Sequence, residues 1–88
     1  MNAFRVILTP EAQTDIKQLD APLQTRILDK LAWMGQNAKY LRHHALQGKE
    51  WSGCFRYRLG DYRIIYQIDR SAEKLVILKV GHRREVYR

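Results

Sequence analysis

The sequence predicts an α+β fold in which two N-terminal helices pack on a small, mostly antiparallel sheet, in the order β-α-α-β-β-β. Three observations predict this class. Residues 10–35 contain two apolar stripes with helical spacing, the sequence from residue 54 onward alternates with a period of two, and a short β-favouring run precedes both. Because 88 residues are enough for one modest core, we expect a single domain over residues 1–88.

The first strand is expected at Phe4–Leu8, and the first helix directly after it. Thr9 can cap the N-terminus of this helix, and Pro10 suits its first position because no amide hydrogen is needed there. The apolar stripe that follows consists of Ala12, Ile16 and Leu19.

A second helix is expected to begin at Asp20-Ala21-Pro22 and to end at Gly35, since glycine favours helix C-termini. Trp33 lies within this helix and is expected in the core. The stripe that should face the sheet consists of Leu23, Ile27, Leu31 and Met34.

The segment CFRYRLGDYRIIY, residues 54–66, predicts a β-hairpin whose two-residue loop is Gly60-Asp61. The numbers of opposed residues then sum to 121, so that Arg58 faces Arg63. One face of the hairpin is wholly apolar or aromatic, and a slip by one residue would mix the two faces. Further along, the unbroken apolar run Leu75–Leu78 predicts a central strand. The second face of the hairpin carries Cys54, Arg56, Arg58, Arg63, Ile65 and Gln67.

The pairing of Arg58 with Arg63 is unfavourable by itself, because like charges across a sheet destabilise it by about 0.2–1 kcal/mol. Arg56 lies on the same face. One interpretation is a solvated outer face on which arginine stems cover apolar surface. The other is an anion site, since guanidinium groups match phosphate oxygens with paired donors. A bound phosphate would turn their mutual repulsion into shared attraction.

The charge is strongly positive and unevenly distributed. The chain has 16 Lys and Arg residues against nine Asp and Glu residues, a formal net charge of +7. Eleven of these basic residues but only five of the acidic ones lie in residues 41–88. A one-sided cationic surface attracts polyanions, most commonly nucleic acid. A basic surface that only aids solubility is the alternative.

Other residues restrict the chemistry. His82 is a candidate for proton transfer near neutral pH, and Tyr87 offers a ring for base stacking; the alternative for each is a structural role. His43 and His44 lack accompanying ligands at metal spacing, so we expect no metal site. A chain of this length leaves no room for a deep pocket, so we expect no small-molecule cofactor either. The single cysteine, Cys54, is expected to be inert and suits a reducing cytoplasm. No signal peptide or membrane-spanning run is recognised.

The stretches LQGKEWSGCFRYRLGDYRIIYQI (residues 46–68) and LKVGHRREVYR (residues 78–88) resemble the RelE/ParE superfamily of bacterial toxins. The hairpin motif is specific to the superfamily, and the closing Val-Gly-x-Arg…Val-Tyr is typical of its RelE branch. The resemblance implies a microbial-ribonuclease-like RelE fold and neutralisation by a cognate antitoxin. RelE-type members cut messenger RNA in the ribosomal A site, whereas ParE-type members poison DNA gyrase.

The resemblance also implies roles for individual residues. Arg56 and Arg58 occupy strand positions that are often lysines in RelE-type enzymes. Because arginine is a poor general base, a base must come from elsewhere in the protein. His82 is a candidate proton shuttle. Arg63, which follows the hairpin turn, matches a family arginine. Arg83 and Tyr87 match the arginine and the tyrosine of the family's closing motif. The predicted catalytic set is Arg56, Arg58, Arg63, Arg83, Tyr87 and His82, and the predicted further RNA contacts are Lys49, Arg84 and Arg88.

The function expected from this resemblance is that of a type II toxin acting as a ribosome-dependent mRNA endoribonuclease. Attack by the RNA 2′-hydroxyl on the adjacent phosphate needs a base, an acid and nearby cations but no metal, and positioning by the ribosome would supply much of the rate. The expected partners are the ribosome, mRNA in its A site and a cognate antitoxin with an acidic segment. A ParE-like inhibitor of DNA gyrase and a plain nucleic-acid-binding module are the alternatives.

Overall fold

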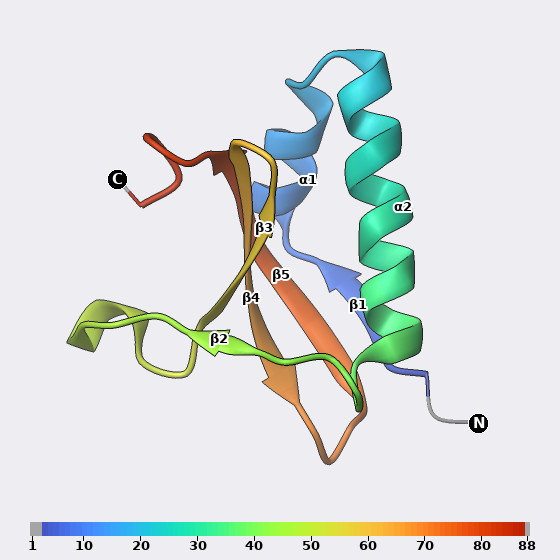
Figure 1. Cartoon of the computed structure of the whole chain (residues 1–88), viewed down its shortest axis with the longest axis vertical. Helices are drawn as coiled ribbons and strands as arrows, with labels where there is room; N and C mark the ends of the chain where they lie inside the picture. Colours follow the sequence, from blue (N-terminus) through green and yellow to red (C-terminus); the bar gives the residue numbers. More distant parts are fainter. Residues whose placement is uncertain (1–2, 88) are drawn as a thin grey trace.

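The computed structural model describes residues 3–87 and has the predicted fold class, with one additional strand. Two helices pack on a twisted five-stranded sheet (Figure 1). None of the helices within residues 3–87 has the length and apolar character needed to cross a bilayer. The elements are β1 (Arg5–Leu8), α1 (Pro10–Lys17), α2 (Ala21–Asn37), β2 (His44–Ala45), the 3-10 helix η1 (Lys49–Trp51), β3 (Phe55–Leu59), β4 (Tyr62–Asp69) and β5 (Lys74–His82).

The strands follow the order β1-β5-β4-β3-β2, and all neighbours are antiparallel except β1 and β5. The β3–β4 hairpin has the predicted register, with Arg58 paired to Arg63 and Leu59 paired to Tyr62. Gly60 in its loop has a φ of 60°, in the left-handed region that glycine adopts without strain. The position of β5 between β1 and β4 confirms the predicted inner strand.

The strand β2 was not predicted from the sequence. It has only two residues, and His44 pairs with Arg56 while Ala45 pairs with Phe55. Two residues show no alternation that could be recognised. The strand therefore forms by pairing with the edge of β3. This pairing brings His44 next to Arg56.

Both helices begin where the sequence predicts. The Thr9 hydroxyl oxygen accepts a hydrogen bond from the Ala12 amide at 3.2 Å, and the Asp20 carboxylate accepts one from the Leu23 amide at 3.0 Å. Each cap is followed by a proline in the first turn of its helix. The Thr9 hydroxyl also donates to the carbonyl oxygen of Ile77 at 2.9 Å, which ties the start of α1 to β5.

The predicted end of the second helix at Gly35 is wrong, because α2 continues to Asn37. Gly35 is buried inside the helix, and its carbonyl oxygen accepts a hydrogen bond from the Phe4 amide at 2.8 Å. A Cβ atom at this position would lie 2.7 Å from the Phe4 carbonyl oxygen and 2.9 Å from Cγ2 of Val6. The missing side chain thus permits close approach of α2 to the first strand and does not end the helix.

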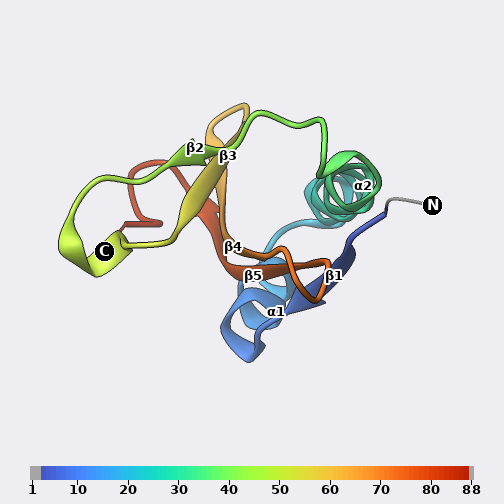
Figure 2. The ribbon, with the colours of Figure 1, turned by 90° about the horizontal axis from the view of Figure 1, so that it is seen from below.

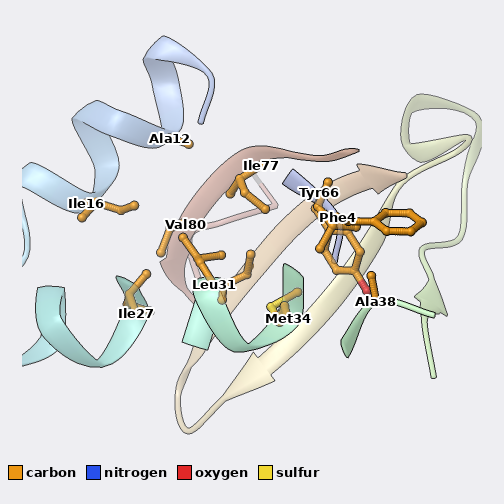
Figure 3. Packing of buried hydrophobic residues seen from close by; sticks show 12 residues of the cluster. Phe4, Ala12, Ile16, Ile27, Leu31, Met34, Ala38, Tyr66, Ile77 and Val80 are labelled. Carbon is orange, nitrogen blue, oxygen red and sulfur yellow. The ribbon is translucent and has the colours of Figure 1, made fainter. Parts of the chain in front are cut away.

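The main core fills the space between the helices and the sheet (Figure 3). Both predicted helical stripes and the apolar face of the hairpin contribute to it, as the sequence suggested. Members that are fully or almost fully buried include Ala12, Ile27, Leu31, Met34, Ile64, Tyr66, Leu75 and Ile77.

Trp33 does not lie in this core, and that prediction is wrong. Its side chain is 41% exposed, on the flank of α2. The ring meets Tyr57 edge to face at a centroid distance of 6.3 Å, and Nζ of Lys30 lies 4.5 Å from the centroid of the Trp33 ring. The inward positions of the helix are taken by Leu31 and Met34, so residue 33 is turned to the side.

A second, smaller apolar cluster covers the opposite face of the sheet. The segment after β5 contributes Val86, which returns over Gly81: a Cβ atom at Gly81 would lie 3.5 Å from Cβ of Val86. Figure 2 shows this C-terminal segment and the β2–η1 segment on the side of the sheet away from α2. The cluster consists of the buried Cys54, Ile65 and Val86, with the partly buried Leu46, Trp51 and Leu78 packed against them.

We expect Gly35→Ala to lower the free energy of unfolding by about 1–3 kcal/mol, because the added methyl group overpacks α2 against Phe4 and Val6. Helix propensity alone predicts the opposite sign, since alanine is better than glycine in a helix interior by about 1 kcal/mol. Urea unfolding followed by circular dichroism measures the difference. The exposed neighbour Gln36→Ala is the matched control and should change stability by less than about 0.5 kcal/mol. A Gly35→Ala protein as stable as the parent would contradict the close packing.

Candidate nucleic-acid interface

Arg58 and Arg63 face each other across the hairpin, but their side chains have different surroundings. Arg63 is only 7% exposed, and its Nη1 donates to the carbonyl oxygens of Gly60 and Tyr62, both at 2.9 Å. Arg58 is exposed. Because the guanidinium of Arg63 is turned back onto the hairpin loop, Arg63 braces that loop, and Arg58 can meet a ligand.

Arg56 lies on the same face of β3, beside β2. Its side chain is half-buried, and its Nε is buried with no hydrogen-bond partner within residues 3–87. Leaving a buried donor without an acceptor costs about 1–3 kcal/mol. The position of Arg56 therefore lowers the stability of the fold.

A cavity of about 340 Å³ lies beside Arg56 and Arg58, next to β2. Arg42 and His44 complete its polar lining, and no carboxylate within residues 3–87 lines it. We call the space lined by these four residues the cationic cavity. Guanidinium groups remain charged at all relevant pH values and match phosphate oxygens in geometry, so the cationic cavity suits a phosphate group.

Arg42 and His44 are not among the site residues predicted from the sequence, which indicated His43 and His44 only as poor candidates for metal ligands. Residues 3–87 contain no group of three or more His, Cys, Asp and Glu side chains that could hold a metal ion. The alternation of side chains along residues 42–44 could nevertheless have predicted that Arg42 and His44 share one face. In an extended segment residues 42 and 44 point to one side and residue 43 to the other, so an inward His43 would direct both neighbours outward.

His43 does point inward and fixes the segment that lines the cationic cavity. Its Nε2 donates to the carbonyl oxygen of Ala38 at 2.8 Å, which leaves Nδ1 to accept from the Tyr66 hydroxyl at 2.6 Å. The imidazole also stands edge to face against the rings of Phe55 and Tyr66. Burial, with a smaller contribution from Tyr57, raises the pKa of the Tyr66 phenol well above its ordinary value, so the hydroxyl remains a donor.

The segment after β5 brings Arg83 to the hairpin loop and Tyr87 to the second apolar cluster. The amide of Arg83 donates to the carbonyl oxygen of Asp61 at 2.8 Å, and Nε of Arg83 lies 3.9 Å from Oδ1 of Asp61. Both side chains are largely exposed, so this ion pair is weak. Tyr87 is 37% exposed, and its ring stands edge to face against Trp51 at a centroid distance of 5.9 Å.

Of the three residues predicted as further RNA contacts, two lie within the described part of the chain. Lys49 in η1 and Arg84 in the turn after β5 are both exposed. Arg88 lies outside the described residues.

His82 is not brought together with the arginines. It pairs with Tyr62, and the two rings meet edge to face at 5.6 Å on the side of the sheet that bears the main core. The cavity at His82, of about 390 Å³, is lined by one lysine and by the carboxylates of Glu11, Asp15 and Glu85. This predominantly acidic lining is unfavourable for a phosphate.

A β-bulge explains the position of His82. The register between β4 and β5 shifts at Ile65/Tyr66, because Tyr66 pairs with Ile77 whereas Ile65 pairs with Lys79. In a regular strand, side chains alternate between the two faces of the sheet. With Ile77 facing the main core, residue 82 would then lie on the opposite face, where Arg56 and Arg58 are. The one extra residue in β5 reverses that alternation, as bulges do.

Comparison with known proteins places the chain in a family. Residues 6–87 match the family described as "ParE toxin of type II toxin-antitoxin system, parDE". Toxin RelG of Mycobacterium tuberculosis (strain ATCC 25618 / H37Rv) is 31% identical over 85 residues, which cover 97% of each chain. The chain belongs to the RelE/ParE superfamily of type II toxins.

Solved structures of RelE/ParE toxins confirm the predicted fold. The toxin–antitoxin complex RelBE2 from Mycobacterium tuberculosis matches with a TM-score of 0.83 and 26% identity over 97% of both chains. A RelE–RelB complex from Pyrococcus horikoshii OT3 matches with a TM-score of 0.75 and 24% identity, covering 98% of this chain and all of the other. The intact RelBE complex of E. coli, at 18% identity and a TM-score of 0.70, covers 91% of this chain and 96% of its own. At these last two identities the likeness is one of fold.

We expect Tyr66→Phe to weaken the fold at neutral pH and to flatten its loss of stability in alkali. Without the hydroxyl, Nδ1 of His43 has no donor, which costs about 1–3 kcal/mol. The pKa of the Tyr66 phenol is raised in the folded state, so above the ordinary value the unfolded chain releases a proton that the folded chain keeps. Stability therefore falls from about pH 10 upward, by at most about 1.4 kcal/mol per pH unit, and the variant lacks this contribution.

Urea unfolding at neutral pH and just above about pH 10 measures both effects. Tyr40, which is 77% exposed, is the matched control, and Tyr40→Phe should keep the stability and the alkaline slope of the parent. An alkaline slope in Tyr66→Phe as steep as that of the parent would contradict the assignment.

Proposed function

We propose that this chain is a RelE-type mRNA endoribonuclease that acts in the ribosomal A site and thereby inhibits translation. The observation that carries the proposal is the cationic cavity, in which arginines converge without a compensating carboxylate within residues 3–87. The similarity to Toxin RelG over nearly the full length of both chains supports it.

In this proposal the RNA 2′-hydroxyl attacks the adjacent phosphate, and side chains of the toxin stabilise the negative charge that develops on the phosphate oxygens. Arg58 and Arg56 would contact the scissile phosphate, Arg58 through its exposed guanidinium and Arg56 through the part of its side chain that lines the cationic cavity. Donors placed in advance at such a position lower the barrier without a metal ion. Arg63 is a positioning residue, because it acts through the hairpin loop that it braces.

The segment after β5 would hold the RNA on either side of that phosphate. Tyr87 and Trp51 form an aromatic pair on which a base can stack, an interaction worth about 1–3 kcal/mol per base. Arg83, at the hairpin loop, would contact the phosphate or the leaving group. Further phosphate contacts are proposed for Lys49, Arg84 and Arg88.

Positioning by the ribosome is part of the proposal. Arg56 and Arg58 bind a phosphate more strongly than lysines would, but an arginine is not an efficient general base. For an enzyme without an efficient base, the reaction rate depends strongly on how well the 2′-hydroxyl is held in line with the phosphate. Such positioning can lower the activation barrier by about 7–11 kcal/mol. The ribosome would do so for mRNA in its A site, which also places the toxin in the cytoplasm.

A cognate antitoxin is the second proposed partner. RelBE2 of Mycobacterium tuberculosis and RelBE of E. coli were solved as toxin–antitoxin complexes. With a formal net charge of +7, this chain favours a partner segment rich in Asp and Glu. Such a segment would cover the arginines of the hairpin and thereby exclude RNA.

Inhibition of DNA gyrase is the other candidate function, because the family that matches residues 6–87 is described as ParE toxin. The two functions differ in which process stops first after the toxin is induced. We expect protein synthesis to stop while plasmid supercoiling is still normal. Loss of supercoiling before any effect on translation would overturn the ribonuclease proposal in favour of gyrase.

We expect Arg58→Ala to lower single-turnover cleavage of ribosome-bound mRNA by about 100- to 1,000-fold, the usual effect of removing one well-placed donor. The fold should persist, because Arg58 is exposed and its loss relieves repulsion with Arg63. Arg70→Ala is the matched control: it removes the same charge from the exposed β4–β5 turn and should cleave at the parental rate. Primer extension on the mRNA measures both variants.

The same assay tests the nucleophile. An mRNA with a single 2′-deoxy nucleotide immediately 5′ of the scissile phosphate should remain uncut, because the attacking hydroxyl is missing. Cleavage of that substrate, or an Arg58→Ala rate equal to that of Arg70→Ala, would contradict the proposed mechanism.

A further inference from the structure

We propose that His44 is the general base that takes the proton from the RNA 2′-hydroxyl. This inference rests on the proposed ribonuclease function and assigns the step that the arginines cannot perform. A guanidinium stays protonated at every relevant pH, whereas a histidine side chain exchanges a proton near neutrality and contributes about 10²- to 10⁴-fold as a general base.

His44 occupies the right place for this step. It pairs with Arg56 at the edge of the sheet and lines the cationic cavity together with Arg42 and Arg58. Its side chain is exposed, and within residues 3–87 no hydrogen bond, ion pair or ring contact engages the imidazole. A ring nitrogen is therefore available to accept a proton beside the groups that would hold the phosphate.

The residues on either side of His44 determine where it points. The ring of His43 is held in the core by Ala38 and Tyr66, and Ala45 is paired with Phe55. Because successive residues of an extended segment alternate in direction, an inward His43 directs His44 toward the cationic cavity. The backbone carrying the imidazole is thus anchored on both sides, which favours a base that must meet its substrate in one geometry.

The charged groups that face His44 are cationic. Arg42 comes from its own segment, and Arg56 and Arg58 come from β3, the strand packed against it. No carboxylate within residues 3–87 lines the cavity, so no acidic side chain there competes for the guanidiniums or for the imidazole. When these arginines bind the scissile phosphate, the imidazole of His44 would face the ribose that carries the attacking 2′-hydroxyl.

The proposed step balances without any further reactant except water. A neutral His44 nitrogen accepts the proton of the 2′-hydroxyl as the bond between O2′ and phosphorus forms. The bond between phosphorus and O5′ breaks, and the leaving O5′ takes a proton from water. The products are a 2′,3′-cyclic phosphate and a 5′-hydroxyl end, and the imidazolium then returns its proton to solvent.

His82, the candidate proton shuttle in the sequence, is the competing assignment. It lies on the opposite face of the sheet from Arg58, against Tyr62, in a cavity lined mainly by carboxylates. A proton acceptor there would be separated by the sheet from the phosphate that Arg56 and Arg58 hold.

The test measures single-turnover cleavage of ribosome-bound mRNA by the full-length toxin between about pH 6 and 8. The parental rate should rise with pH as the base loses its proton. His44→Gln should cleave about 10²- to 10⁴-fold more slowly and lose this rise, whereas His82→Gln should retain it. His44→Ala should recover activity as imidazole is added, a rescue that a merely structural residue would not show. Thermal unfolding and ribosome pelleting verify that the variants fold and bind.

The outcomes separate this inference from the proposed function. If the parent cleaves mRNA but His44→Gln keeps both its rate and its pH dependence, the assignment of His44 is overturned while the ribonuclease stands. Loss of the pH dependence in His82→Gln alone would overturn it as well, in favour of His82. A parental toxin that cuts no ribosome-bound mRNA would overturn the ribonuclease proposal and the assignment together.

Discussion

The alternation of side chains along β3 and β4 is the constraint on which the rest of the structure depends. With the loop at Gly60 and Asp61, the aromatic residues of the hairpin face the main core and its arginines face away. A shift of pairing by one residue would expose Tyr66 and drive guanidinium groups into the core, at a cost that no other contact offsets. The register that stabilises the fold is therefore also what gathers positive charge on the second face.

Most of the fold could be predicted because its signals are local. The caps at Thr9 and Asp20, the helical stripes and the hairpin are each specified within a few residues of the element they define. Two of the failures concern contacts between distant segments. Gly35 looks like a helix end until Phe4 is packed against it, and β2 owes its existence to the edge of β3. Those contacts exist only once the chain has folded.

The candidate site could be predicted in part for the same reason. Local register places three arginines on one face, but it does not reveal that loop carbonyls occupy Arg63 while Nε of Arg56 has no acceptor within residues 3–87. That contrast distinguishes a buried guanidinium whose donors are satisfied from one that retains an unsatisfied donor at some expense of stability. Similarly, His44 joins the site through the anchoring of its neighbour, and His82 leaves it through a bulge in β5.

The parallel pairing of β1 with β5 has a consequence for how the protein is made. β5 follows every other element in the sequence, yet it lies between β1 and β4, and its Val80 amide donates to the Asp15 carboxylate of α1 at 3.0 Å. A nascent chain emerges N-terminus first, so the part of the helical stripes that β5 covers stays exposed until β5 arrives. The sheet that displays the arginines is therefore completed only after β5, the last of the described elements, has been made.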